Sequence, residues 1–246
     1  MKENVSAKRT GLAGQTAVIV GASSGIGLAS ARALAARGAR VIGVARNRDR
    51  LLQAAGEAGF EPREADTLDR GSLDRLFEGL PGLDHLVVTA YGTPPWGPLS
   101  QLTEESIRGA FDYKFMGYFR TVQAVLPKLS RQGSITLITG AVARFAMAGG
   151  SGPAAVNGAL HAWAYSLAKE LAPIRVNSVS PGLTATAAYD AMPAEAREKM
   201  FRDAAAHLPV VKIAQAEDIA AAVAFAVCSP VLTGAVLDVD GGVRLG

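Results

Sequence analysis

Along this chain, short runs rich in β-branched residues alternate regularly with longer segments rich in alanine and leucine. This pattern is typical of βαβ units, whose right-handed crossovers build a parallel sheet covered by helices on both faces. Strands are expected at 17–20, 40–44, 86–89, 134–138, 175–179 and 236–239, with a weaker one at 60–65. Helices are expected near 26–37, 48–58, 69–79, 103–130, 154–172, 193–206 and 216–227. The sequence therefore predicts an α/β fold with a doubly wound parallel sheet.

Length and composition indicate a single domain. The 246 residues include no linker, internal repeat or break in composition, and their number suits one sheet-centred core. Residues 1–246 are expected to form this domain, with 1–11 as a flexible N-terminal extension. Residues 1–14 lack the apolar stretch of a signal peptide, and the longest apolar run is about half of a membrane span. These features predict a cytoplasmic protein without a membrane partner.

Charge and cysteine content narrow the class of ligand. The net charge is only +3, and the basic residues are spread along the chain. This distribution argues against nucleic acid as a partner and favours, weakly, a small anionic ligand. The single cysteine, Cys228, excludes an intramolecular disulfide and lies in an apolar run, so it is expected to be a buried filler rather than a nucleophile. No metal site is expected.

A glycine-rich segment, 21–27, follows the first expected strand directly and opens a helix. Glycines permit a tight turn and let backbone N–H groups approach a pyrophosphate, which the positive end of the helix dipole favours. A tight strand-to-helix turn without a ligand is the alternative, but the surrounding βαβ unit favours a dinucleotide site. The residues expected to bind the phosphates are Gly21, Ser23, Ser24, Gly25, Ile26 and Gly27.

The residue after the second expected strand indicates which dinucleotide is bound. An acidic residue there would accept hydrogen bonds from the ribose hydroxyls of NAD, whereas an arginine accommodates the 2′-phosphate of NADP. This chain has Arg46 at that place, with Arg48 and Arg50 close behind. These arginines could also be the solvated start of a helix. The sequence nevertheless favours NADP over NAD as the cofactor.

Further motifs give the chain a family resemblance. They are Asp66 after the third strand, the segment 84–90 on the fourth, and the segments 166–172, 174–182 and 233–242. Over 12–245 the chain resembles the short-chain dehydrogenase/reductase family, which implies a Rossmann-type fold. The resemblance also implies that Asp66 contacts the adenine, Ala90 the adenosine ribose, and 181–186 the nicotinamide end. The cofactor-binding residues that it adds are Asp66, Thr67, Thr89, Ala90, Tyr91, Asn157, Pro181, Gly182, Thr184 and Thr186.

The same resemblance implies hydride transfer between the nicotinamide and a carbonyl or alcohol, carried out with a tyrosine, a lysine, a serine and a helix asparagine. Tyr165 and Lys169 fit the usual tyrosine–lysine spacing, but they overlap a segment that follows the catalytic pair in relatives. We therefore interpret them as structural. Aligned on that segment, the usual serine, tyrosine, lysine and asparagine positions are Gly140, Pro153, Asn157 and Lys114.

These substitutions exclude the usual mechanism, because neither proline nor glycine has a side chain that can move a proton. Lys114 and Tyr91 are the candidate substitute acids, although a lysine at the edge of a long helix and a tyrosine packing a loop are the ordinary interpretations. His161 is expected to be a packed helix residue. Thr139 is expected to point to the opposite side of its strand from position 140, so it is not assigned the serine role.

Three functional classes follow: an atypical NADP-dependent oxidoreductase acting on a carbonyl or alcohol, a non-catalytic NADP(H)-binding or regulatory protein, and a non-redox isomerase or lyase. The expected partner is a small-molecule substrate. The loops 91–99 and 187–209 are expected to cover its pocket, and their apolar content suggests a non-ionic substrate face.

The helices at 103–130 and 154–172 carry apolar residues around much of their surface, and relatives pair these helices across a twofold axis. A homodimer or homotetramer is therefore expected.

Overall fold

The computed structural model describes residues 11–89, 92 and 94–245. Within these, seven strands form one sheet in the order β3-β2-β1-β4-β5-β6-β9, and neighbouring strands are parallel throughout. The winding reverses between β1 and β4, so the sheet is doubly wound, as the sequence predicts. The strands are β1 (Thr16–Val20), β2 (Arg40–Ala45), β3 (Glu61–Glu64), β4 (Leu83–Val88), β5 (Leu129–Ile138), β6 (Arg175–Pro181) and β9 (Val236–Val239).

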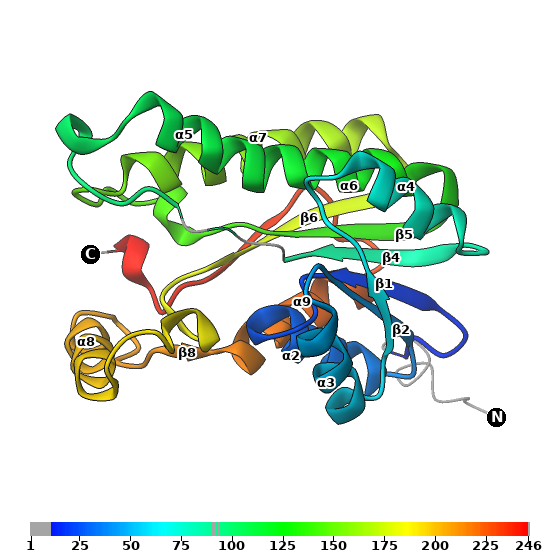
Figure 1. The fold of residues 1–246 in the computed structure, drawn as a ribbon, viewed down its shortest axis with the longest axis horizontal. Helices are drawn as coiled ribbons and strands as arrows, with labels where there is room; N and C mark the ends of the chain where they lie inside the picture. Colours follow the sequence, from blue (N-terminus) through cyan, green and yellow to red (C-terminus); the bar gives the residue numbers. More distant parts are fainter. Residues whose placement is uncertain (1–10, 90–91, 93, 246) are drawn as a thin grey trace.

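Helices cover both faces of this sheet (Figure 1). One layer consists of α2 (Gly25–Ala35), α3 (Arg48–Ala58) and α9 (Ala216–Cys228), and the other of α4 (Arg70–Glu78), α5 (Glu104–Ala110), α6 (Gly117–Val125) and α7 (Ser151–Glu170). Helix α8 (Ala194–Ala206) lies to one side of the layers, beside a short sheet of β7 (Thr184–Ala185) and β8 (Ala214–Gln215). None of the helices in the described ranges combines the length and apolar character that a membrane crossing requires.

The two helix layers are anchored by two apolar cores, one on each face of the sheet. Strand β1 illustrates the reason, because Val18 and Val20 enter one core while Ala17 and Ile19 enter the other. Successive side chains of a strand point to opposite faces, so a strand buried on both sides forms a nearly continuous apolar run. This is why the short continuous β-branched runs of the sequence identify the strands.

The expected helix at 103–130 is the main difference between the predicted and observed elements. It is divided into α5, a π-helical turn η2 (Phe111–Met116), α6 and a short 3₁₀ turn η3 (Leu126–Lys128), after which β5 begins at Leu129. Pro127 lies in the 3₁₀ turn and has no N–H to continue an α-helix. The short strands β7 and β8 were not expected, since each is only two residues long. The remaining predicted strands and helices differ from the observed ones mainly at their ends.

Candidate functional site

The glycine-rich loop 21–27 lies at the carboxyl end of β1, where the winding of the sheet reverses and open α/β sheets bind ligands. Gly21 and Gly25 have φ values of +96° and +53°, which favour glycine. A Cβ on Gly27 would overlap the carbonyl oxygen of Gly21 and lie 2.7 Å from Thr89 Oγ1. Ser24, the N-cap of α2, makes no side-chain cap, so the first-turn N–H groups are left for another acceptor. The loop is therefore a cradle that fits a phosphate group.

Arg46 follows β2 and is exposed beside this loop. Its guanidinium carbon lies 5.3 Å from the ring centroid of Tyr113, a cation–π contact that joins the second strand to the turn η2. Sequence reasoning missed Tyr113, because nothing local in the sequence connects two positions so far apart. The contact places an aromatic ring next to the arginine that is expected to bind the 2′-phosphate.

Asp66, Thr67 and Thr89 lie at the ends of β3 and β4. Asp66 is half-buried, and its Oδ1 accepts a hydrogen bond from the N–H of Leu68 at 3.0 Å. Thr67 is buried, and a Cβ on Gly117 would lie 3.1 Å from Thr67 Oγ1. The first residue of α6 therefore packs directly against Thr67. The Thr89 hydroxyl donates to the carbonyl oxygen of Val20 at 3.0 Å and so holds β4 to β1. Ala90 and Tyr91, which the sequence adds to this group, lie outside the described residues.

Residues expected at the nicotinamide end come from the loop after β6. Pro181 ends that strand, and a Cβ on Gly182 would lie 2.8 Å from the Cα of Asp240, so only glycine fits there. Thr184 Oγ1 donates to the carbonyl oxygen of Gly182 at 3.0 Å. A Cβ on Gly25 would lie 3.3 Å from the Cβ of Thr186, which brings this loop against the glycine-rich loop. The loops expected to bind the pyrophosphate and the nicotinamide are therefore adjacent.

Gly140, Pro153 and Asn157 come together between the end of β5 and the first two turns of α7. A Cβ on Gly140 would lie 3.2 Å from Asn157 Nδ2, so positions 140 and 157 face each other. The same amide nitrogen donates to the carbonyl oxygen of Pro153 at 2.8 Å, one turn earlier on the helix. The three positions assigned from the alignment thus form one cluster.

Lys114 reaches the same cluster from the π-helical turn η2, the type of helical irregularity that often marks functional sites. Its Nζ donates to Asn157 Oδ1 at 2.7 Å and to the carbonyl oxygen of Thr139 at 3.1 Å. The side chain is buried, not solvated at a helix edge, and burial lowers the pKa of Lys114 to about 7. Burial therefore disfavours the charged form of this amine.

His161 and Thr139 form a second buried pair beside the lysine. The Thr139 hydroxyl donates to the carbonyl oxygen of Val179 at 3.1 Å, and it accepts from Nε2 of His161, 2.7 Å away. Burial, with a smaller contribution from the Arg144 guanidinium, lowers the pKa of His161 to about 4. The neutral imidazole is thus packed. The threonine hydroxyl contacts α7, the helix that also carries Asn157, so it does not point to the opposite side from position 140 as the sequence predicts. Tyr165, which lies farther along α7, is 57% exposed, and a Cβ on Gly234 would lie 3.8 Å from its ring. Lys169 is exposed as well.

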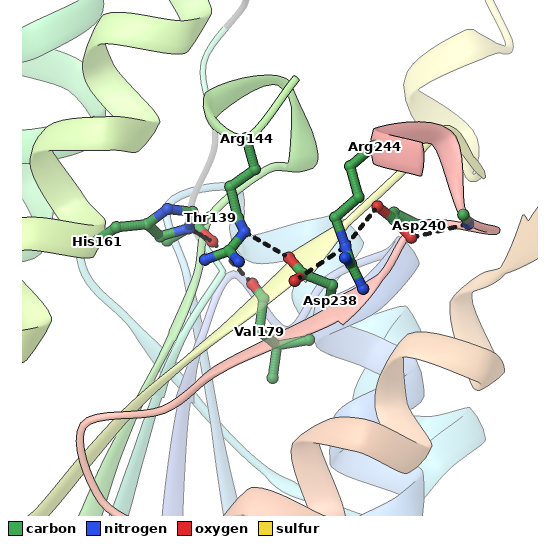
Figure 2. Close-up of polar contacts among 8 residues, drawn as sticks. Thr139, Arg144, His161, Val179, Asp238, Asp240 and Arg244 are labelled. Carbon is green, nitrogen blue, oxygen red and sulfur yellow. Dashed lines mark hydrogen bonds and ion pairs between the residues drawn. The ribbon is translucent and has the colours of Figure 1, made fainter. Parts of the chain in front are cut away.

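Four charged side chains lie next to these groups (Figure 2). Arg144 Nε lies 3.3 Å from Asp238 Oδ1, and Arg244 Nε lies 3.1 Å from Asp238 Oδ2 and 3.4 Å from Asp240 Oδ2. Arg144 follows the 3₁₀ turn η4 (Ala141–Ala143), and Arg244 belongs to η6 (Val243–Leu245). Sequence reasoning missed this cluster, although all four residues lie at or just beyond the carboxyl ends of expected strands.

Comparisons with known proteins agree with this architecture. Residues 21–244 match the family model described as enoyl-(acyl carrier protein) reductase. An uncharacterized oxidoreductase of Methylorubrum extorquens is 34% identical over 95% of this chain and 99% of its own length.

Solved structures are also similar to this chain over nearly its whole length and nearly their own. A small-chain dehydrogenase in complex with NADPH is 37% identical, covers 94% of this chain and 99% of its own, and has a TM-score of 0.83. The MalC reductase/Diels-Alderase of Malbranchea aurantiaca is 25% identical, covers 97% of this chain and 99% of its own, and has a TM-score of 0.89. With the family model and the relatives matching nearly the whole chain, the protein belongs to the short-chain dehydrogenase/reductase family of oxidoreductases.

Proposed function

We propose that the protein is an NADP(H)-dependent oxidoreductase for a small carbonyl or alcohol substrate, with a site in which a lysine and an asparagine have exchanged positions relative to the family pattern. The observation that carries this proposal is the hydrogen bond of 2.7 Å between Lys114 Nζ and Asn157 Oδ1, next to Gly140. It joins a cation and an amide at the place where the family uses the same two kinds of group.

The cofactor assignment is supported by the glycine-rich cradle and by Arg46. NADP(H) would be held by the N–H groups of 23–27 at its pyrophosphate, by Arg46 at its 2′-phosphate and by the 181–186 loop at its nicotinamide end. When bound, the nicotinamide supplies the hydride for carbonyl reduction. The similar dehydrogenase described with NADPH adds support for NADP over NAD.

The exchange concerns the helices from which the two groups project. In the family pattern the lysine belongs to the helix that starts at Ser151, and the asparagine to the helix around η2. Here Asn157 occupies the first place and Lys114 the second. Since the two side chains contact each other, the ammonium lies close to where the usual lysine would place it. The proposed site therefore retains a cation and an amide, but it has no hydroxyl at position 140 or 153.

Lys114 is the group that we assign as the proton donor. Its pKa of about 7 suits general acid chemistry near neutral pH, because a donor is most effective when its pKa is close to the working pH. In carbonyl reduction it would protonate the oxygen that becomes an alkoxide, and Asn157 would orient its Nζ. Tyr91 remains a second candidate for the same role. Without the tyrosine and serine, we expect slow turnover of simple ketones, which offer no further group for positioning.

Reciprocal substitution tests this assignment. Wild type and variants are compared for NADPH binding by nucleotide fluorescence and for NADPH oxidation over a panel of aldehydes and ketones. We expect Lys114→Asn and Asn157→Lys each to lower kcat by about 10²–10³-fold, and the double exchange to recover part of that loss. Lys169→Asn is the control, because that lysine is exposed on α7. Wild-type kcat in Lys114→Ala would rule out the role of this lysine.

A non-redox reaction is the second candidate, and one observation favours it. The similar MalC protein is described as both a reductase and a Diels-Alderase, so this architecture accommodates chemistry other than hydride transfer. Conversion of a substrate without NADPH consumption would favour that class. Tight NADPH binding without any conversion would favour a non-catalytic, regulatory role.

A further inference from the structure

We propose that Arg144 and Arg244 form a subsite that binds a carboxylate carried by the substrate. This inference rests on the proposed function and extends it, because it names an acidic group on the carbonyl or alcohol compound. It also departs from the non-ionic substrate face suggested by the apolar loops of the sequence.

The two arginines converge from different parts of the chain at the carboxyl edge of the sheet (Figure 2). Arg144 lies four residues after Gly140. Its backbone N–H donates to the carbonyl oxygen of Ala141 at 2.7 Å and so closes η4. Arg244 lies in the turn that follows β9. Both contact Asp238 on β9 through Nε, at 3.3 and 3.1 Å. Figure 2 places Arg144 beside Thr139 and His161, and the carbonyl oxygen of Thr139 accepts a hydrogen bond from Lys114, so the subsite adjoins the Gly140–Asn157–Lys114 cluster.

Two buried carboxylates fix how the guanidinium groups are presented. The side chains of Asp238 and Asp240 are 7% and 5% exposed, whereas those of Arg144 and Arg244 are 38% and 36% exposed. The acids are thus covered by the arginines, and an approaching anion meets guanidinium groups first. Within the described residues, the ion-pair contacts of both arginines run through Nε rather than through Nη1 or Nη2. Their Nε atoms face the carboxylates, and more than a third of each arginine side chain is exposed to solvent.

The charge of this cluster selects the kind of anion. Two arginines and two aspartates sum to zero, so no net positive charge offsets the desolvation of an anion, and this cost is larger for a phosphate dianion than for a singly charged group. A carboxylate carries a single charge, and its two oxygens match the paired N–H groups of a guanidinium. Pre-oriented side chains also lose less conformational freedom on binding than mobile ones. Geometry and charge together favour a monocarboxylate.

Matched ligands test the subsite directly. A panel of aliphatic and aromatic monocarboxylates, each paired with its neutral primary amide, is titrated into the protein with saturating NADP⁺ and followed by ligand-observed NMR. We expect at least one carboxylate to bind about tenfold more tightly than its amide, and phenyl phosphate to bind less tightly than benzoate. Arg144→Gln and Arg244→Gln should each weaken carboxylate binding by about tenfold to a hundredfold and leave amide binding unchanged.

Two further variants separate a binding role from a purely structural one. Arg32→Gln removes an arginine of similar exposure, paired with Glu57 at 3.3 Å on the other helix layer, and should have no effect. Arg144→Lys with Arg244→Lys keeps the charge opposite Asp238 and so protects the fold, but removes the paired N–H edge, and should still weaken carboxylate binding. Equal affinity of the wild type for acids and amides, or carboxylate affinity unchanged in the arginine variants, would overturn the proposal.

The cofactor readout keeps this test independent of the proposed function. NADPH binding is measured on the same samples, and we expect it to be unchanged in both arginine variants. A protein that binds NADPH but does not distinguish acids from amides retains the proposed function and loses the subsite. A protein that binds carboxylates through the arginines but not NADPH loses the proposed cofactor and retains the subsite, since the titration can be repeated without nucleotide.

Discussion

Single residues at the carboxyl edge of this sheet owe their properties to burial. Lys114 is buried against an amide and a carbonyl oxygen, and its pKa is lowered to about 7. His161, on the neighbouring helix, is held neutral by the same physical effect. Arg46 is the opposite case, because it is exposed and its only described aromatic neighbour is Tyr113. Charged groups are thus kept where a phosphate or a reacting oxygen is expected, and neutral groups fill the space between them.

Arg46→Asp tests the preference for NADP at this scale. We expect the variant to bind NADPH about tenfold to a hundredfold more weakly while NADH binding changes little, because a charge-assisted phosphate contact becomes a repulsion. Fluorescence titration with both nucleotides measures the change. Arg131→Asp is the matched control, since that exposed arginine lies near the amino end of β5, away from the carboxyl edge of the sheet. Equal affinity of the wild type for NADPH and NADH would show the assignment to be wrong.

The buried histidine predicts a pH dependence of stability. The pKa of His161 is about 4 in the folded protein against 6.5 in the unfolded chain, so the unfolded chain takes up a proton first as the pH falls. Stability contributed by the neutral histidine is therefore present above pH 6.5 and is lost between 6.5 and 4, by up to about 3 kcal/mol. His161→Gln should flatten this part of the curve of Tm against pH. His85, whose pKa is also lowered to about 4, should keep part of the slope in that variant.

At the scale of elements, the loop between β1 and α2 depends on the absence of side chains. A Cβ on Gly27 would overlap the Gly21 carbonyl oxygen, which is backbone and cannot rotate away. We expect Gly27→Ala to weaken NADPH binding more than tenfold and to destabilise the protein by about 1–3 kcal/mol. Gly56→Ala, in helix α3 with nothing within 4 Å of the added Cβ, is the control and should be neutral or stabilising. Thermal unfolding and nucleotide titration distinguish the two variants, and unchanged NADPH binding in Gly27→Ala would remove the loop from the cofactor site.

Elements of this kind were predictable from the sequence because their patterns are local. The β-branched runs, the glycine-rich loop and Arg46 at the end of β2 are each visible within a few residues. The alignment also gave positions 140, 153 and 157, which the structure brings together. The contact of Lys114 with Asn157 was not predictable, because it requires the π-helical turn that directs the lysine inward. The Arg144–Asp238 pair likewise joins two strand ends that only the folded sheet makes neighbours.

The helix layer that contains α6 and α7 has a surface with partly exposed aromatic side chains. These aromatic side chains form a stripe across α6, η2 and α7. The distance between ring centroids is 5.5 Å for Phe115 and Trp163 and 6.1 Å for Phe119 and Trp163. Each of these three residues is only partly buried in the single chain. Aromatic residues on a helix face are enriched in the cores of protein interfaces. The stripe is the surface on which we expect a second copy to pack, as the apolar surfaces of the predicted helices suggest.

Sedimentation velocity at micromolar concentration tests this assembly. We expect a symmetric dimer or tetramer, since a twofold axis would bring α6 and α7 of one protomer against the same helices of its partner and bury the stripe twice. Phe119→Glu should shift the distribution toward smaller species, because two carboxylates would then be desolvated at the centre of the interface. Phe225→Glu is the control, since that aromatic residue is 57% exposed on α9 in the other helix layer. If the wild type is a dimer built on the stripe, Phe225→Glu should leave it a dimer. If the wild type is a tetramer with a second interface on α9, Phe225→Glu should reduce it to a dimer. A wild-type monomer would contradict the prediction altogether, and it would leave the stripe as an exposed apolar surface without a partner.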